Sequence, residues 1–103
     1  MLAQEVFEIR LREVRDLVYD TLCDYDRLLP GVFPMTEKVL FRGDAPCGVH
    51  FCLHGPRNVK YTSIWETDKN SVLYYNSIGE RFRRTELMED LTVAPSQCDA
   101  QLV

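Results

Sequence analysis

The sequence predicts an α+β fold in which one long N-terminal α-helix packs on one face of a five-stranded antiparallel β-meander. Apolar residues recur with the period of a helix up to residue 29 and with a period of two from residue 37 onward. In addition, the turns between the β-like segments are too short for parallel crossovers. The chain has 103 residues, 46% hydrophobic and 27% charged, which is typical of one globular domain.

The helix is predicted over residues 4–29. Steps of three and four residues place one apolar stripe on one face, and this stripe consists of Phe7, Leu11, Val14, Val18, Leu22, Tyr25 and Leu29. Charged residues such as Arg10 fall largely outside the stripe. Pro30 and Gly31 are expected to end the helix.

Five short strands are predicted after the helix, and residues that favour turns separate each strand from the next. The predicted strands cover residues 37–42, 48–54, 59–67, 72–77 and 80–87. Residues 1–90 are expected to form a single α+β domain, and residues 91–103 a loosely held C-terminal tail.

The turn lengths predict which side chains share a face of the sheet, because directly paired residues lie on the same face. If residues 55–58 close the second hairpin, His54 pairs with Val59, and the later strands follow from their own turns. The expected core face then carries Val39, Phe41, Val49, Phe51, Leu53, Thr62, Ile64, Leu73, Tyr75 and Phe82. The second face includes Leu40, His50, Cys52, His54, Tyr61, Trp65, Tyr74, Arg81 and Arg83. A one-residue slip in any turn would flip the strands beyond it.

The second face is predicted to be a binding surface, since aromatic residues and arginine are enriched at protein interfaces and the sequence holds no second helix to cover it. The leading hypothesis is a non-enzymatic interaction module that forms a homodimer through this face or offers it to another protein. Tyr61, Trp65 and Tyr74 would be the anchors, with Arg81 and Arg83 as charges at the rim. The alternative to a partner is that residues of the C-terminal tail fold over this face within one chain.

A small-ligand pocket or weak enzyme, with or without a metal, is the alternative hypothesis; its lining would be His50, Cys52, His54, Tyr61 and Trp65. Zinc needs three or four ligands in tetrahedral geometry, which one flat strand does not easily supply, so neither a metal nor a cofactor is predicted. A thiol–imidazole nucleophile needs a third, orienting group, and none falls on this face, so no catalytic residue is predicted.

Net charge and segment lengths weigh against two partner classes. The formal net charge of −4 argues against a general nucleic-acid binder. The longest apolar run, residues 72–75, is far shorter than the roughly 20 residues of a membrane span. The first ten residues contain charges and lack the apolar region of a signal peptide. The four cysteines form no CxxC pair, so free thiols in a reducing cytoplasm are expected.

Overall fold

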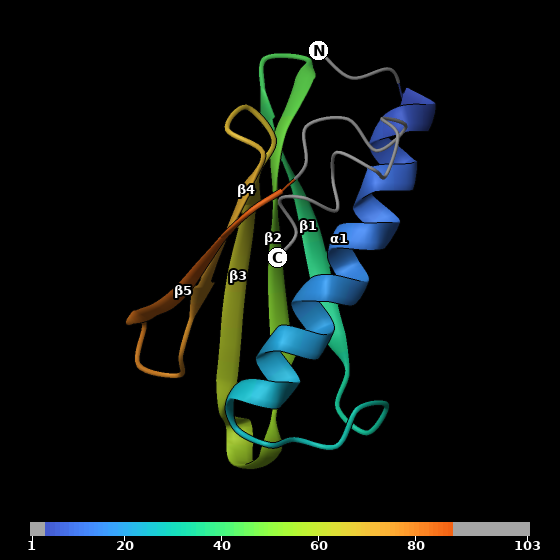
Figure 1. Ribbon diagram of the computed structural model, residues 1–103. Coiled ribbons are helices and arrows are strands. Elements are labelled where there is room, and N and C mark those ends of the chain that lie inside the picture. The colour runs from blue at the N-terminus through green and yellow to red at the C-terminus, as the bar shows by residue number, and fades with distance from the viewer. Residues whose placement is uncertain (1–3, 88–103) are drawn as a thin grey trace, which may run out of the picture.

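The computed structural model describes residues 4–87 and confirms the α+β fold (Figure 1). The helix is α1 (Gln4–Tyr25), and the strands are β1 (Met35–Arg42), β2 (Ala45–His54), β3 (Lys60–Glu66), β4 (Ser71–Tyr75) and β5 (Arg81–Glu86). The strands form one antiparallel sheet in the order β1-β2-β3-β4-β5, and α1 lies across one face of it. The predicted tail, residues 91–103, lies outside the described residues.

The helix is shorter than predicted, because it ends at Tyr25 rather than at residue 29. Arg27 adopts a left-handed backbone conformation, with φ of 57°. The amide of Leu28 donates to the carbonyl oxygen of Cys23 over 2.8 Å, and the amide of Arg27 donates to that of Asp24 over 3.3 Å. These two bonds define a Schellman motif. The helix therefore ends through its own last turn, before Pro30 and Gly31 are reached.

The apolar stripe of α1 packs against the sheet over most of its predicted length. Its buried members are Phe7, Leu11, Val14, Val18 and Leu22. The last two predicted members do not belong to the core, since Tyr25 is exposed and Leu29 is 69% exposed. The physical reason is the early end of the helix, which takes Leu29 out of the helical period.

The loop between β2 and β3 corrects the predicted register of the sheet. It has five residues rather than four, so His54 pairs with Lys60 and not with Val59. The short helix η1 (Pro56–Asn58) lies within this loop. The amide of Gly55 donates to the carbonyl oxygen of Val59 over 2.7 Å, which closes the loop.

The extra loop residue inverts the faces of β3 and β4, because successive side chains of a strand alternate. Trp65 pairs with Val49, and Tyr61 pairs with Leu53, so both aromatic side chains face the helix. Tyr74 is buried in the same core. The prediction that Thr62, Ile64, Leu73 and Tyr75 face the core is therefore wrong; they lie on the opposite face. The third turn covers residues 67–70 rather than 68–71, so Trp65 pairs with Val72 instead of Tyr74; this two-residue change of partner preserves the faces.

The first hairpin is tighter than predicted. Arg42 pairs with Ala45 across a two-residue turn, so β2 begins earlier than residue 48, and Val39 rather than Phe41 pairs with Val49. Val39 packs against the core as predicted, whereas Phe41 is 61% exposed. The predicted place of Phe41 in the core is therefore wrong, because its ring lies beyond the end of the packed region.

Candidate functional site

The face of the sheet opposite α1 is the candidate functional surface, and we call it the open face. Within residues 4–87 no helix lies on it. Its side chains come from all five strands and include Thr36, Lys38, Leu40, His50, Cys52, His54, Lys60, Thr62, Ile64, Glu66, Leu73, Tyr75 and Arg84. An antiparallel sheet can keep such a face toward water, but only a polar face needs no partner.

The residues predicted for the binding surface separate into three groups. One group lies on the open face and consists of Leu40, His50, Cys52 and His54. A second group, consisting of Tyr61, Trp65 and Tyr74, is buried beneath α1. The third group consists of Arg81 and Arg83, which are exposed on the edge strand β5. Arg81 pairs with Tyr75 and so borders the open face, whereas Arg83 pairs with the buried Tyr74.

The three aromatic residues are therefore not anchors of an exposed surface. Trp65 and Tyr74 have no exposed area, and Tyr61 is 3% exposed. The ring of Trp65 stacks on that of Phe7, with 5.6 Å between the ring centroids and 9° between the planes. The five residues predicted to line a ligand pocket do not come together. His50, Cys52 and His54 lie on the open face, while Tyr61 and Trp65 lie beneath the helix.

An apolar centre nevertheless occupies the open face, formed by one residue predicted for the binding face, Leu40, and by three that were predicted for the core. We define this apolar centre as Leu40, Ile64, Leu73 and Tyr75. Ile64 pairs with Leu73 across β3 and β4. Leu73 is only 9% exposed, so the accessible part of the apolar centre comes from Leu40, Ile64 and Tyr75, which are half-buried. The side chain of Leu40 lies over Gly48 of β2. A β-carbon at Gly48 would lie 2.8 Å from the carbonyl oxygen of Trp65, so only glycine fits between these strands.

Charged side chains surround the apolar centre. Lys38 on β1, Lys60 at the start of β3 and Arg84 on β5 are exposed. Glu66 is half-buried and accepts a hydrogen bond of 3.3 Å from the hydroxyl of Ser71. Arg84 forms an ion pair with Glu86 of the same strand, so the rim combines Lys38 and Lys60 with this ion pair and with Glu66.

The histidines of the open face are arranged for hydrogen bonding. Nε2 of His54 lies 3.1 Å from the hydroxyl oxygen of Thr36. Lys38 is paired opposite His50 and Lys60 opposite His54. In the described part of the chain, no group of three or more His, Cys, Asp or Glu side chains is arranged to hold a metal ion.

Several polar groups are buried in the molecule at positions where the sequence analysis did not expect them. Arg10 is 6% exposed, although it was predicted to lie largely outside the apolar stripe, and its Nη1 donates to Oδ1 of Asn70 over 3.1 Å. Its spacing from Phe7 and Val14, three and four residues, is the signal that would have placed it next to the stripe. Nε of Arg10, Nε1 of Trp65 and the hydroxyl of Tyr74 have no hydrogen-bond partner among the described residues.

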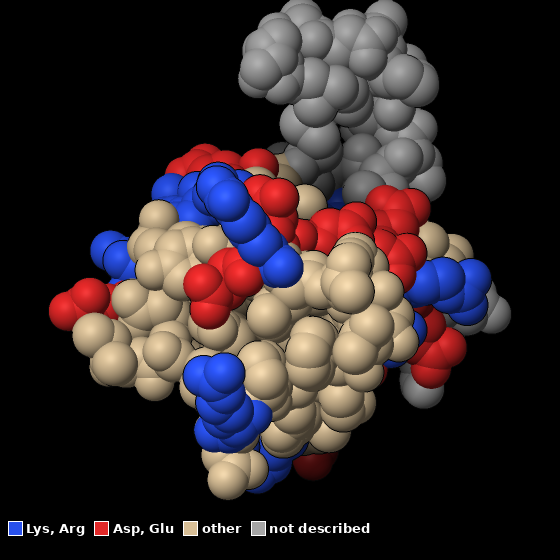
Figure 2. Space-filling view, turned by 90° about the horizontal axis from the view of Figure 1, so that it is seen from below, with Lys and Arg blue, Asp and Glu red and all other residues tan. Residues whose placement is uncertain are grey.

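A second apolar surface lies where α1 ends and β2 turns into β3. Figure 2 views the molecule from this side, and uncharged residues fill the middle of the view while most charged residues lie around it. The loop after the helix contributes the exposed side chains of Leu29 and Val32. The hydroxyl of Tyr19 ties this loop to the helix, because it donates to the carbonyl oxygen of Phe33 over 2.9 Å and accepts from the amide of Gly31 over 2.7 Å.

Comparisons with known proteins do not identify the site. No family model, no curated protein and no solved structure matches the chain. The fold therefore defines the class, a two-layer protein with one helix on an antiparallel meander, and function is inferred from geometry. None of the helices described within residues 4–87 is long and apolar enough to cross a membrane.

Proposed function

We propose that the protein is a non-enzymatic interaction module that forms a homodimer through the open face of its sheet. The observation that carries this proposal is the apolar centre on a sheet face that no described helix covers. Apolar side chains surrounded by charged residues are typical of a protein interface, with a water-excluding middle and a solvated rim. A second copy is the simplest partner because a two-fold axis lets one surface bury itself.

The dimensions of the open face set the area available for a contact. Strands lie about 4.8 Å apart and rise about 3.3 Å per residue. Five strands of five to ten residues therefore give a face about 20 Å wide and about 20–30 Å long. Its projected area of about 400–600 Å² is smaller than the roughly 800 Å² of accessible surface that each partner buries in a standard interface, so the side chains at the rim would also take part in the contact. Two such faces would pack about 10 Å apart, with their strands about 30° from parallel.

Sedimentation equilibrium of the purified protein tests the proposal. The chain has a mass of 12.0 kDa, so the dimer is expected at about 24 kDa. Ile64→Arg places a charge in the apolar centre and is expected to give the monomer mass. Ile64 is half-buried on the open face, so the variant is expected to stay folded, which circular dichroism checks.

Two matched variants separate the open face from other apolar surfaces. Ile78→Arg makes the same change at an exposed residue of the β4–β5 turn, and Leu29→Arg makes a comparable change in the loop after α1. Both are expected to keep the dimer mass. Wild-type protein that sediments at 12.0 kDa up to about 200 µM would refute the homodimer. Dissociation by Leu29→Arg but not by Ile64→Arg would move the interface to the second apolar surface.

The salt dependence of the association distinguishes self-association from binding of an acidic partner. Contact between two copies brings like charges such as Lys38 and Lys60 near each other at the rim. The dimer is therefore expected to be unchanged or tighter in 0.5 M salt, since salt screens this repulsion. A clear weakening by salt would favour an acidic partner protein over a second copy.

We also propose that the protein is located in the cytoplasm. Cys23, Cys47 and Cys52 are free thiols. Cys23 is buried between helix and sheet, and burial raises the pKa of its thiol, which keeps it protonated and unreactive. Recovery of the protein in a membrane or secreted fraction after cell fractionation would contradict this location.

A further inference from the structure

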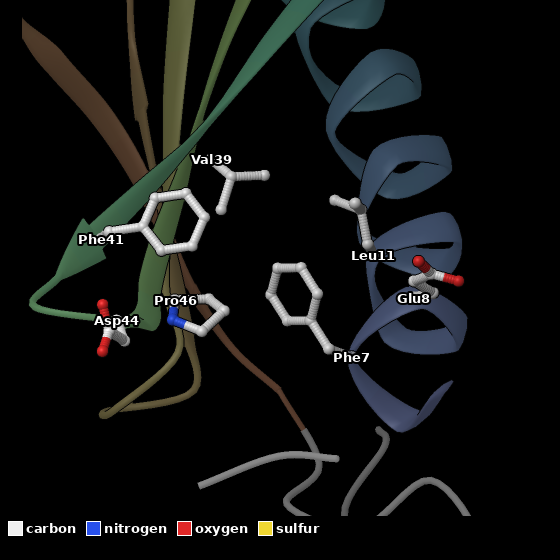
Figure 3. A pocket seen from close by; sticks show the side chains of 7 residues that line it. All are labelled: Phe7, Glu8, Leu11, Val39, Phe41, Asp44 and Pro46. Carbon is white, nitrogen blue, oxygen red and sulfur yellow. The ribbon is translucent and has the colours of Figure 1, made fainter. Parts of the chain in front are cut away.

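A cavity of about 570 Å³ opens between the N-terminal half of α1 and the β1–β2 hairpin. Figure 3 shows Phe7 and Leu11 reaching from the helix toward Val39, Phe41 and Pro46 on the strands. The cavity arises because α1 packs mainly on β2, β3 and β4, so the far end of β1 is left without a helix above it. It lies on the helix side of the sheet, away from the open face.

The apolar walls of the cavity are held in place by the surrounding structure. The ring of Phe7 stacks on Trp65, which is fully buried. On the strand side, a β-bulge after Leu40 pairs Phe41 with Pro46 and leaves Cys47 without a partner, so Phe41 and Pro46 lie side by side on the helix side. Bulges commonly direct side chains in this way beside binding sites.

Two carboxylates complete the lining. Glu8 extends from the helix and Asp44 from the hairpin turn, so they lie on opposite sides of the apolar walls (Figure 3). Among the described residues that line the cavity there is no lysine or arginine. The cavity thus combines apolar and aromatic walls with negative charge at its margin, a combination that favours a ligand with an apolar body and a positive end.

We propose that this cavity binds a small amphipathic organic amine, with its aromatic or branched apolar body against Phe7 and Phe41 and its ammonium group toward Asp44. The volume suits such a ligand, because small-molecule pockets span about 300–1,000 Å³. The inference goes beyond the proposed dimer and does not depend on it. Failure of the dimer would leave the cavity unchanged, and failure of amine binding would leave the open face unchanged.

Three probes with the same apolar body and different end groups test the inference, namely 4-phenylbutylamine, 4-phenylbutan-1-ol and 4-phenylbutanoate. Trp65 supplies the signal, because it is the only tryptophan of the chain and stacks on Phe7. Titration of the full-length protein is expected to change its fluorescence saturably with the amine. The alcohol is expected to bind about threefold to fivefold more weakly than the amine. The carboxylate is expected to bind at most about tenfold more weakly than the amine, since exposed charge pairs have modest strength.

Matched variants assign the effect to the cavity. Asp44→Asn is expected to reduce the affinity for the amine to that for the alcohol and to leave alcohol binding unchanged. Glu80→Gln removes an exposed carboxylate of the β4–β5 turn, which does not line the cavity. This variant is expected to change neither the affinity for the amine nor that for the alcohol. Phe41→Ser is expected to weaken the binding of all three probes, and circular dichroism checks that this variant is folded.

Three results would overturn the inference. Equal affinity for the three probes would remove the role of charge. Absence of a saturable change up to about 10 mM amine would remove the site, because binding weaker than this is not specific for a drug-sized ligand. An equal loss of amine affinity in Glu80→Gln and Asp44→Asn would show a general charge effect rather than a contact at Asp44.

Discussion

Tyr61 is an ionisable side chain that the fold keeps neutral. Its ring is buried beneath α1, and its hydroxyl donates a hydrogen bond to the carboxylate of Asp26, which follows the end of the helix. Burial is the larger cause and the hydrogen bond to Asp26 the next, and together they raise the pKa of Tyr61 from 10.0 to about 12. The bond joins the C-terminal end of α1 to the start of β3, so a single hydroxyl connects the two layers.

This raised pKa predicts a loss of stability in strong alkali. In the unfolded chain Tyr61 ionises near pH 10, whereas in the folded protein it ionises near pH 12. Its contribution is therefore complete below about pH 10 and is lost as the pH rises to about 12, an expected fall of about 2–3 kcal/mol in the free energy of unfolding. Urea unfolding between pH 8 and pH 12 measures this fall.

Tyr61→Phe is the control for that measurement. It removes the hydroxyl and is expected to lower stability at pH 8 by about 1 kcal/mol, the usual loss for one hydrogen bond. Its stability is expected to decline less between pH 10 and pH 12, because one ionisation no longer favours the unfolded chain. Parallel curves for the wild type and Tyr61→Phe would contradict the assigned pKa.

Arg10 is a charged residue that the structure buries. The sequence analysis grouped it with the charged residues that fall largely outside the apolar stripe. The structure buries it three residues after Phe7, where its long aliphatic stem packs at the helix–sheet boundary and Nη1 reaches Asn70. Long cationic side chains can cover apolar surface in this way, so helical spacing is the better guide to their position.

At the level of elements, the end of α1 depends on one backbone conformation. Arg27 occupies the left-handed position of the Schellman motif, where glycine is usual because it has no β-carbon. The side chain of Arg27 is exposed, and no described contact of it is required for the turn. The residue therefore bears conformational strain of about 1 kcal/mol.

Arg27→Gly is accordingly expected to stabilise the protein by up to about 1 kcal/mol, measured as an increase in the urea midpoint with an unchanged slope. Arg27→Val is the matched contrast, because a β-branched side chain in the left-handed region is more strained and should destabilise. The interpretation fails if glycine and valine shift the midpoint in the same direction.

The β2–β3 loop is the element that decided the faces of the sheet. Glycine, proline and asparagine at residues 55–58 correctly predict a turn. They do not determine whether Val59 belongs to the loop or to the strand. The structure includes Val59 in the loop, through its carbonyl bond with the amide of Gly55. Because side chains alternate with a period of two, this single residue moved Trp65 from the predicted surface to the core.

At the scale of the whole molecule, the core lies where α1 crosses β2, β3 and β4, and the margins of the sheet extend beyond it. Both proposed binding regions follow from this arrangement. The open face exists because one helix can cover only one side of a sheet. The cavity exists because the same helix does not reach the end of β1. One α-helix is thus too small to bury all the apolar surface that five strands present.

Neighbouring residues of β3 give a direct test of which face is the core. Trp65→Ala is expected to lower the free energy of unfolding by about 3–5 kcal/mol, because it leaves a large cavity beneath Phe7. Ile64→Ala, on the open face, is expected to lower it by about 1 kcal/mol when measured on the monomer. Urea unfolding at low protein concentration provides both values. A larger loss for Ile64→Ala would reverse the assignment of the faces.

Sequence periodicity by itself determined that this chain has one amphipathic helix followed by five antiparallel strands, because the helical and strand periods are local properties that any short segment displays. Tertiary structure alone decided that Tyr61 and Trp65 belong to the core and that Ile64 and Leu73 belong to the open face. The predicted and the observed assignment of faces both satisfy the alternation of side chains along β3. The choice between them depends on burying the larger aromatic surface against a helix more than thirty residues away in the sequence.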